Sequence, residues 1–416
     1  MRPLGDGKER PMLYQTHLRV HLDAIRHNLA GIREAVGPDV AVLLAVKSNG
    51  YGHGAVEVAR DVERAGLVDR FGVATVPEGI ELRGAGVRSP ILKLSHAFPE
   101  EIDAALAHDL ELAVVDAAGA DAVAEAALAR GVVAPVHLKI DTGMGRIGTT
   151  PDTAPELAVR IEDSPHLHLL GAFTHFPTSD TPAEDAFTDG QIATFTRAVA
   201  DVQARLGRCL ELVHMANSGG VLAHPEAWGT MVRPGIMAYG YYPDATTPRT
   251  IDLRPAITWA TRISFLKQVP SGGTVGYGRT WAAPRDTWVA TIPVGYGDGF
   301  DRHLSNVGTV LVGGRRYPIV GSVCMDQSMI DVGPEPVVAV GDEVVLLGRS
   351  GELEYTADDM AELLGTISYE VTCAIAPRVA RVHIGGGDIS RPGAGDRREF
   401  EGTDGGEDRS AVPSSL

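Results

Sequence analysis

The sequence is poor in cysteine, has no long apolar run and carries few basic residues for its acidic content. Its three cysteines, Cys209, Cys324 and Cys373, are widely separated and odd in number, which favours a reducing compartment over a disulfide framework. They form no Cys-x-x-Cys pair, and we predict no metal site. No apolar stretch is long enough for a bilayer, and no apolar core follows the polar N-terminus. We therefore expect neither a membrane span nor a signal peptide, and a cytoplasmic location.

Acidic residues outnumber basic ones. The chain has 54 Asp and Glu against 37 Lys and Arg, a formal net charge of -17, which argues against nucleic acid or an anionic membrane as a partner. The 416 residues are 44% hydrophobic and 22% charged, as in an ordinary globular protein. This length allows roughly two to four domains.

After a polar leader over residues 1–16, the chain alternates short apolar runs with helical patterns. Leu18 to Leu22 alternates in polarity, and Asp23 could cap a helix that carries Ile25, Leu29 and Ile32. Eight strand candidates follow, and eight alternations in about 200 residues match a closed (β/α)8 TIM-like barrel, predicted over 17–249, better than an open sheet. The candidates are Val40 to Val46, Phe71 to Val76, Ile91 to Leu94, Leu112 to Val115, Val136 to Ile140, Leu167 to Thr174, Leu210 to His214, and Met231 to Arg233.

Beyond residue 250 the helical pattern mostly disappears. Short alternating runs, such as Thr309 to Val312 and Glu343 to Leu347, are separated by Gly, Asp and Pro. We predict a C-terminal, mainly β domain over 250–384, with a helix from Thr356 to Leu364 that Thr356 caps. Residues 385–416 contain few large apolar side chains, and we predict that they are disordered.

Polar residues stand at the ends of the predicted barrel strands, where the active sites of such barrels lie. The loops after the seventh and eighth strands commonly bind phosphate, and glycine lets backbone amides approach an anion. Ser218-Gly219-Gly220 and Gly235-Ile236 occupy these two loops, although a glycine can also serve only a turn. The polar residues at strand ends are Lys47, Lys139, Asp141, His175, His214, Asn217 and Arg233.

The stretch Ala45 to Gly54 holds the strongest candidate. A buried strand delivers Lys47 to its end, and a turn rich in glycine follows. A lysine in that position can lose its proton and attack a carbonyl, as pyridoxal phosphate requires. A solvated loop end is the alternative that the residues of this stretch leave open.

A second segment, Lys139 to Gly148, places Lys139 and Arg146 near one strand end. Two cations there repel each other unless an anion lies between them or the lysine is neutralised. An unmodified Lys139 that pairs with Asp141 is the alternative.

These stretches together resemble the alanine racemases, the fold-type-III pyridoxal-phosphate enzymes, in separated motifs from about residue 12 to residue 383. The resemblance implies that Lys47 holds pyridoxal 5'-phosphate and that Tyr51 touches its phosphate. Ser48 and Gly50 depart from the residues more usual there, and both are small. The cofactor-binding residues that it implies are Lys47, Tyr51, Arg146, His175, Asn217, Ser218, Arg233, Gly235, Ile236 and Tyr369.

The resemblance also assigns roles to the cations. Lys139 matches a lysine that is N-carbamylated in many members and positions the arginine matched by Arg146, which contacts the cofactor's phenolic oxygen and the substrate carboxylate. Arg233 matches the arginine that faces the pyridine nitrogen, and the counterparts of His175 and His214 orient it. A guanidinium offers no acceptor, so the nitrogen facing it stays unprotonated, which favours return of the proton to the substrate over transamination.

The motif Val275 to Trp281 matches the family's second base. Racemisation needs a proton acceptor on each face of a planar intermediate, and one lysine cannot serve both. The resemblance implies that Tyr277 is supplied by the other subunit of a homodimer and that Lys47 serves the D-enantiomer. A strand tyrosine packed on Trp281 is the alternative. Three further matches are an entrance tyrosine at Tyr296, a backbone that meets the substrate carboxylate at Met325, and the neighbouring Asp326.

The function expected from this resemblance is interconversion of L-alanine and D-alanine, which supplies D-alanine for peptidoglycan. A broader or specialised racemase, for serine as an example, is an alternative that Ser48, Gly50 and Phe176-Pro177 leave open. Decarboxylation of basic amino acids fits less well, because those enzymes place a carboxylate where Arg233 stands. A protein that only binds the cofactor, or one that sequesters an inhibitor, is the non-catalytic alternative.

Overall fold

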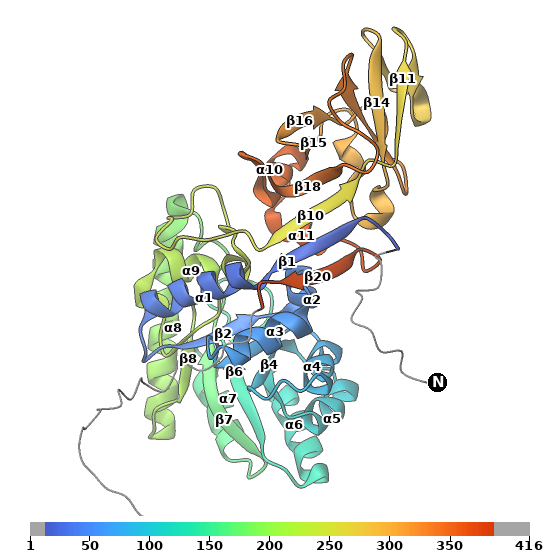
Figure 1. The fold of residues 1–416 in the computed structure, drawn as a ribbon. Helices are drawn as coiled ribbons and strands as arrows, with labels where there is room; N and C mark the ends of the chain where they lie inside the picture. Colours follow the sequence, from blue (N-terminus) through green and yellow to red (C-terminus); the bar gives the residue numbers. More distant parts are fainter. Residues whose placement is uncertain (1–12, 387–416) are drawn as a thin grey trace, which may run out of the picture. The chain divides into compact units, whose positions relative to one another are not determined.

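The computed structural model describes residues 13–386. Its larger sheet is built from eight parallel strands in the order β8-β7-β6-β5-β4-β3-β2-β9, and the surrounding helices are seen in Figure 1. Each predicted barrel strand corresponds to one of these. Their bounds are β2 (Ala41–Ala45), β3 (Arg70–Val73), β4 (Ile91–His96), β5 (Leu110–Val114), β6 (Ala134–Lys139), β7 (Leu167–Phe173), β8 (Leu212–His214) and β9 (Met231–Val232).

The sheet closes almost completely. β8 and β9 share no regular ladder, but the Thr230 N–H donates to the Val213 carbonyl at 2.9 Å and the Arg233 N–H donates to the Ala216 carbonyl at 2.9 Å. The predicted fold class, a (β/α)8 barrel followed by a mainly β domain, is therefore confirmed.

The helices follow the apolar periodicity of the sequence. In α1, Ile25, Leu29 and Ile32 are fully buried, as the spacing predicts. The predicted cap is wrong, because α1 begins directly after His21 and Asp23 lies inside its first turn. The barrel helices are α1 (Leu22–Val36), α3 (Ala55–Arg64), α4 (Val76–Gly84), α5 (Pro99–Ala107), α6 (Ala117–Arg130), α7 (Ala154–Glu162), α8 (Asp185–Leu206) and α9 (Ser218–Ala223).

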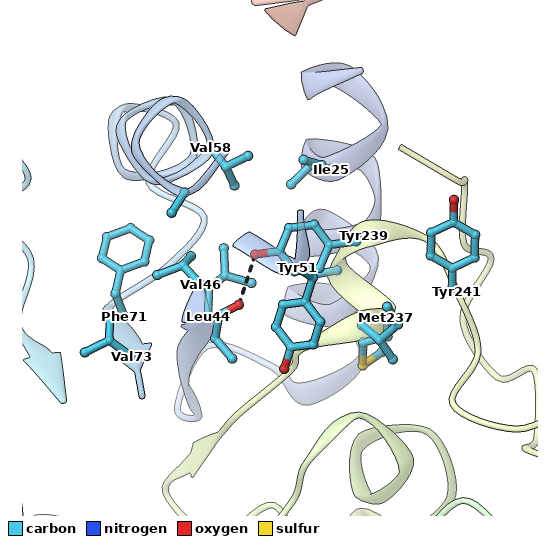
Figure 2. Close-up of a cluster of buried hydrophobic side chains, with 14 of the residues drawn as sticks. Ile25, Leu44, Val46, Tyr51, Val58, Phe71, Val73, Met237, Tyr239 and Tyr241 are labelled. Carbon is cyan, nitrogen blue, oxygen red and sulfur yellow. Dashed lines mark hydrogen bonds between the residues drawn. The ribbon is translucent and has the colours of Figure 1, made fainter. Parts of the chain in front are cut away.

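The two faces of a barrel strand enter different cores. Leu44 and Val46 belong to the main core, where Figure 2 shows them near Val58 of α3. Leu43 points the other way, because side chains alternate along a strand, and clusters separately with Leu92 and Met231. This smaller cluster fills only part of the barrel interior and leaves space there for polar side chains.

The C-terminal part is antiparallel except for one pairing. Its largest sheet has the order β16-β15-β18-β10-β1-β20, with β19 on β18; β11-β14-β17 and β12-β13 form two smaller sheets. The bounds are β10 (Ile257–Arg262), β11 (Phe265–Val269), β12 (Thr274–Val275), β13 (Trp281–Ala282), β14 (Thr287–Ile292), β15 (Thr309–Val312), β16 (Arg315–Pro318), β17 (Ser328–Gly333), β18 (Glu343–Ser350), β19 (Leu353–Tyr355), β20 (Ala380–Ile384), α10 (Ala357–Leu364) and α11 (Ser368–Cys373).

The first strand, β1 (His17–His21), lies in this C-terminal sheet although the predicted barrel range begins at residue 17. It pairs antiparallel with β10 and parallel with β20. Just before it, the buried Thr16 hydroxyl lies 2.8 Å from the Thr261 hydroxyl. A strand's non-local partner cannot be inferred from its own alternation.

The predicted α10 begins as expected. Thr356 accepts a hydrogen bond from the Asp359 N–H at 3.1 Å, and the Asp359 carboxylate accepts from the Thr356 N–H at 2.7 Å. The described residues exclude residues 1–12, which are most of the predicted leader. They also exclude residues 387–416, which are nearly all of the predicted disordered tail. Within the described range, no helix combines the length and apolar character of a membrane span.

Candidate active site

Lys47 stands where β2 ends, at the start of an unusual turn. Ser48, Asn49, Gly50 and Tyr51 all have φ between 53° and 63°, so this segment (α2, Lys47–Tyr51) turns in the left-handed sense. L-residues avoid that conformation. The sequence predicts a sharp turn here but not its hand.

Two side chains hold this turn. Glu78 of α4 accepts a hydrogen bond from the Ser48 N–H at 2.6 Å, and Asn49 accepts one from the Ala55 N–H at 2.9 Å. The turn aims Lys47 into a cavity of about 310 Å³. Burial and the nearby charge of Arg146 lower the pKa of Lys47, which favours the neutral, nucleophilic amine.

The cavity brings together most of the predicted site. It lies at the C-terminal ends of the barrel strands and is also lined by Ser48, Phe173 and Cys373, which the sequence does not predict as site residues. The predicted residues that line it are Lys47, Tyr51, Lys139, Arg146, His175, Asn217, Ser218, Arg233, Gly235, Ile236 and Tyr369.

Arg233 is buried and almost fully hydrogen-bonded. Its Nη1 donates to the His214 carbonyl at 2.8 Å and to His214 Nδ1 at 3.0 Å. Its Nη2 donates to the carbonyls of Thr174 (2.6 Å) and Met215 (2.9 Å) and lies 3.4 Å from His175 Nδ1. Nε–H is the one donor of this guanidinium without an acceptor among residues 13–386, and Arg233 lines the cavity.

Burial lowers the pKa of Arg233 to about 9, so the guanidinium still carries its charge at neutral pH. Burial and this neighbouring charge lower the pKa values of His175 and His214 well below the usual range. Both histidines are therefore neutral, and His214 offers Nδ1 as an acceptor to Nη1, which can only donate. This is the arrangement expected of residues that orient Arg233.

Lys139 is buried without a partner. Within the described part of the chain its ammonium nitrogen has no hydrogen-bond acceptor, and it lies 5.0 Å from the centre of the Phe173 ring. Burial, with the charge of Arg233, lowers the pKa of Lys139 to about 7. Asp141 is engaged elsewhere, accepting from the N–H groups of Gly143 (3.0 Å) and Gly145 (3.1 Å). The structure therefore does not contain the alternative ion pair between Lys139 and Asp141.

The opposite end of the cavity offers neutral donors. Burial raises the pKa values of Tyr51 and Tyr369, so both hydroxyls keep their protons, and the two rings lie 5.9 Å apart. Gly235 passes so close to Tyr51 that an added Cβ would lie 2.5 Å from the tyrosine hydroxyl oxygen. The Ser218 hydroxyl accepts from the Gly235 N–H at 2.9 Å. An anion fits this end because the hydroxyl groups of Tyr51, Ser218 and Tyr369, which can donate, line the cavity there.

Asn217 lines the cavity, but its side chain forms hydrogen bonds with other groups of the protein. Its Oδ1 accepts from the Gly220 N–H at 3.0 Å and from the Ser179 hydroxyl at 2.7 Å, and its Nδ2 donates to the Phe176 carbonyl at 3.1 Å. The side chain caps α9 and so orders the loop that carries Ser218.

Of the five predicted site residues of the β domain, Tyr369 lines this cavity and the other four do not. Tyr277, Tyr296 and Met325 are 76%, 45% and 54% exposed. Asp326 forms an ion pair with Arg378 at 2.9 Å, and Arg378 Nη2 lies 3.4 Å from the Met325 carbonyl.

Besides Ser48 and Phe173, three residues in or near the site are absent from the sequence prediction. Cys373 stands four residues after Tyr369 on α11, a spacing that puts both on one helix face. His137 stands two residues before Lys139 on β6 and therefore shares its side of the strand. Glu111 of β5 lies 3.1 Å from His137. Helical and strand spacing from Tyr369 and Lys139 could have indicated the first two, but not Glu111.

Two protein families match nearly the whole described part of the chain. The alanine racemase N-terminal domain family matches residues 20–243, and the alanine racemase C-terminal domain family matches residues 256–383. The chain belongs to the alanine racemase family. It is similar to the curated alanine racemase of Cutibacterium acnes, with 49% identity over 370 residues that cover 89% of this chain and 98% of the relative.

Solved structures of alanine racemases have the same fold as this chain. That of Clostridium difficile 630 superposes with a TM-score of 0.85 at 35% identity, covering 90% of this chain and 96% of the other. That of Bacillus anthracis, solved with bound L-Ala-P, has a TM-score of 0.84 at 35% identity, with 90% and 96% covered.

Proposed function

We propose that the cavity binds pyridoxal 5'-phosphate and that the chain uses it to interconvert L-alanine and D-alanine. The observation that carries the proposal is the presence, in one cavity, of a lysine with a lowered pKa, Lys47, and a buried guanidinium, Arg233, whose Nε–H has no acceptor among residues 13–386.

The residues present fit this cofactor at three points. Lys47 is positioned and activated to attack its aldehyde carbon. The Nε–H of Arg233 is free to donate to a ring nitrogen, which must then be unprotonated. The donors of Tyr51, Ser218 and Tyr369, beside Gly235 and Ile236, suit its phosphate. When bound, the cofactor withdraws electrons from the substrate α-carbon and so acidifies the proton there.

The chain's own groups move that proton. We infer that Lys47 exchanges the α-proton on the D-alanine face and that Tyr277 of a second copy exchanges it on the L-alanine face. Arg146 binds the substrate carboxylate, and a carbamate on Lys139 would hold Arg146 by charge. Met325 meets the carboxylate through its backbone, Asp326 supports the same loop through its ion pair with Arg378, and Tyr296 stands at the entrance. His175 and His214 keep Arg233 in place.

This assignment carries a cellular expectation. The protein acts as a cytoplasmic homodimer with two shared sites, and in a bacterium its D-alanine enters peptidoglycan. Crystal structures of relatives bear on the ligand class: one from Clostridium difficile is a complex with cycloserine, and that from Bacillus anthracis holds L-Ala-P.

The test uses one preparation in two steps. Purified protein should show a cofactor absorbance band, and borohydride should fix the cofactor on the peptide that contains Lys47. L-alanine in deuterated water should then yield α-deuterated D-alanine. Lys47→Arg, which keeps the positive charge, is the control that should lose both the fixed label and the exchange.

Other outcomes separate the alternatives. A band without α-exchange on alanine would reject alanine and call for a panel that includes serine, and no exchange on any amino acid would favour a binding protein. The absence of a band would reject the cofactor itself.

A further inference from the structure

Arg233 is joined to the far end of the barrel by a line of buried side chains, of which the proposed function uses only His214. His214 Nδ1 lies 3.0 Å from Arg233 Nη1, and His214 Nε2 lies 3.1 Å from His137 Nδ1. His137 Nε2 lies 3.1 Å from the Glu111 carboxylate, whose other oxygen pairs with Arg70 at the start of β3. His214 and His137 are fully buried, and Glu111 and Arg233 are 5% exposed.

Only one placement of the protons on His214 and His137 is compatible with the hydrogen bonds along this line. A guanidinium only donates, so His214 Nδ1 must be the acceptor and its proton must sit on Nε2. That N–H donates to His137 Nδ1, which forces the proton of His137 onto its Nε2. This second N–H then donates to Glu111, which can accept it only as a carboxylate. Arg70 donates to the other oxygen and ends the line.

Charge favours the same order. Burial raises the pKa of Glu111, but the hydrogen bond from His137 and the hydrogen bond and charge of Arg70 outweigh it and leave the pKa below its usual range. Burial and Arg233 hold His214 in its neutral form. A protonated Glu111 would donate to His137 instead, reverse both histidine tautomers and point an N–H of His214 at an N–H of Arg233.

We propose that Glu111 and His137 are positioning residues for Arg233: the Glu111 carboxylate fixes the tautomers of His137 and His214, and His214 thereby holds the guanidinium with Nε–H toward the cavity. This inference rests on the proposed function, in which Arg233 faces the ring nitrogen. It extends the site from Arg233 to the opposite end of the barrel. There Glu111 pairs with Arg70, at the start of β3, and controls the tautomer of His214.

The sharpest test replaces Glu111 with Gln. Arg70 would claim the amide oxygen, because it can only donate, and would leave the amide NH2 facing His137 Nε2. His137 and His214 must then move their protons to Nδ1. The double variant Arg70→Met with Glu111→Gln frees the amide oxygen to accept from His137, so the original order should return. Asp121→Asn, which breaks the exposed Asp121–Arg160 pair, is the matched control.

Long-range 1H–15N correlation spectra of histidine-labelled protein report the tautomers directly. In the wild type we expect Nε2–H on both histidines, in the Glu111→Gln variant Nδ1–H on both, and in the double variant Nε2–H again. With the cofactor loaded, the ratio of transamination to racemisation should rise about ten- to hundredfold in the single variant, the effect expected from one lost charged hydrogen bond. It should fall back in the double variant.

Several results would overturn the inference. Nδ1–H on either histidine of the wild type contradicts the donor order, whether or not any variant folds. Tautomers that do not respond to Glu111→Gln, or a double variant that behaves like the single one, contradict control by the carboxylate. The spectra do not require the cofactor, so a protein that binds none would reject the proposed function while the tautomers still test the line.

Discussion

Two lysines share the cavity, and burial acts on each of them in a different way. Lys47 is half-buried and stands next to Arg146, and its lowered pKa suits a nucleophile that must give up its proton. Lys139 is 2% exposed, lies near Arg233 and has no acceptor within residues 13–386. A buried amine without a partner is costly unless it is neutral or modified. The first lysine thus suits the proposed attachment of the cofactor, and the second suits the proposed carbamylation.

Lys139 should therefore take up CO2 as the pH rises through about 7. The neutral amine attacks CO2, a C–N bond forms and one proton leaves, so the carbamate grows above the pKa, whereas an ordinary lysine would need a pH near 10. After equilibration with 13C-bicarbonate, 13C NMR should show a carbamate signal that is stronger at about pH 8 than at about pH 6. Lys139→Met is the control. A signal that persists in this variant, or none at the higher pH, would refute the expectation.

At the scale of elements, the site depends on a strained backbone turn after Lys47 and on the close approach of Gly235 to Tyr51. Each residue of the left-handed turn at Ser48 to Tyr51 costs roughly 1–2 kcal/mol, except the glycine. Glu78 and Asn49 hold this turn, and β9 then brings Gly235 against Tyr51. Strain of this kind persists where the surrounding structure fixes it, as at functional sites.

Gly235→Ala should weaken cofactor binding. The new Cβ would lie 2.5 Å from the Tyr51 hydroxyl oxygen, and the Tyr51 ring is held between Tyr239 (5.1 Å) and Tyr369 (5.9 Å). Overpacking of about 1–3 kcal/mol corresponds to a roughly ten- to hundredfold weaker Kd in an absorbance titration. Gly84→Ala, which meets open space at the end of α4, should leave the Kd unchanged. An unchanged Kd in Gly235→Ala would remove Tyr51 and Gly235 from the phosphate end.

The cap of α10 should matter for stability alone. Thr356→Ala removes the acceptor for the Asp359 N–H and should lower the free energy of unfolding by about 1 kcal/mol. Glu184→Ala is the matched control, because Glu184 precedes α8 without a capping hydrogen bond. Urea unfolding should separate the two variants, with racemase activity unchanged in both. Equal midpoints would mean that the cap contributes nothing.

The sequence predicts elements and strand ends better than it predicts partners. Lys47, Lys139 and Arg233 could be placed at one barrel face because parallel strands end together. β1 could not be placed, since its alternation fits a barrel strand and an antiparallel strand equally well. Glu111 could not be linked to the site, because its contact with His137 joins two strands and depends on which face of each is inward. The position of Tyr277 depends on a second chain, which one sequence does not describe.

At the scale of the whole molecule, one copy of the chain contains half of the proposed site. The cavity holds Lys47 and the proposed cofactor contacts, while Tyr277 and Met325 are exposed on the β domain. Aromatic and methionine side chains are common at subunit interfaces. In a twofold dimer the same surface on each copy meets its counterpart, so the proposed dimer would complete both sites at once.

Mixing two inactive variants tests this account most directly. Lys47→Ala and Tyr277→Phe, unfolded and refolded together in equal amounts, should form hybrid dimers in which one site has both Lys47 and Tyr277 intact. Random pairing makes about half of the dimers hybrid, so about a quarter of the wild-type racemase activity should return. If hybrid dimers form and no activity returns, Tyr277 does not act on the Lys47 of a second copy, and the proposed shared site is wrong.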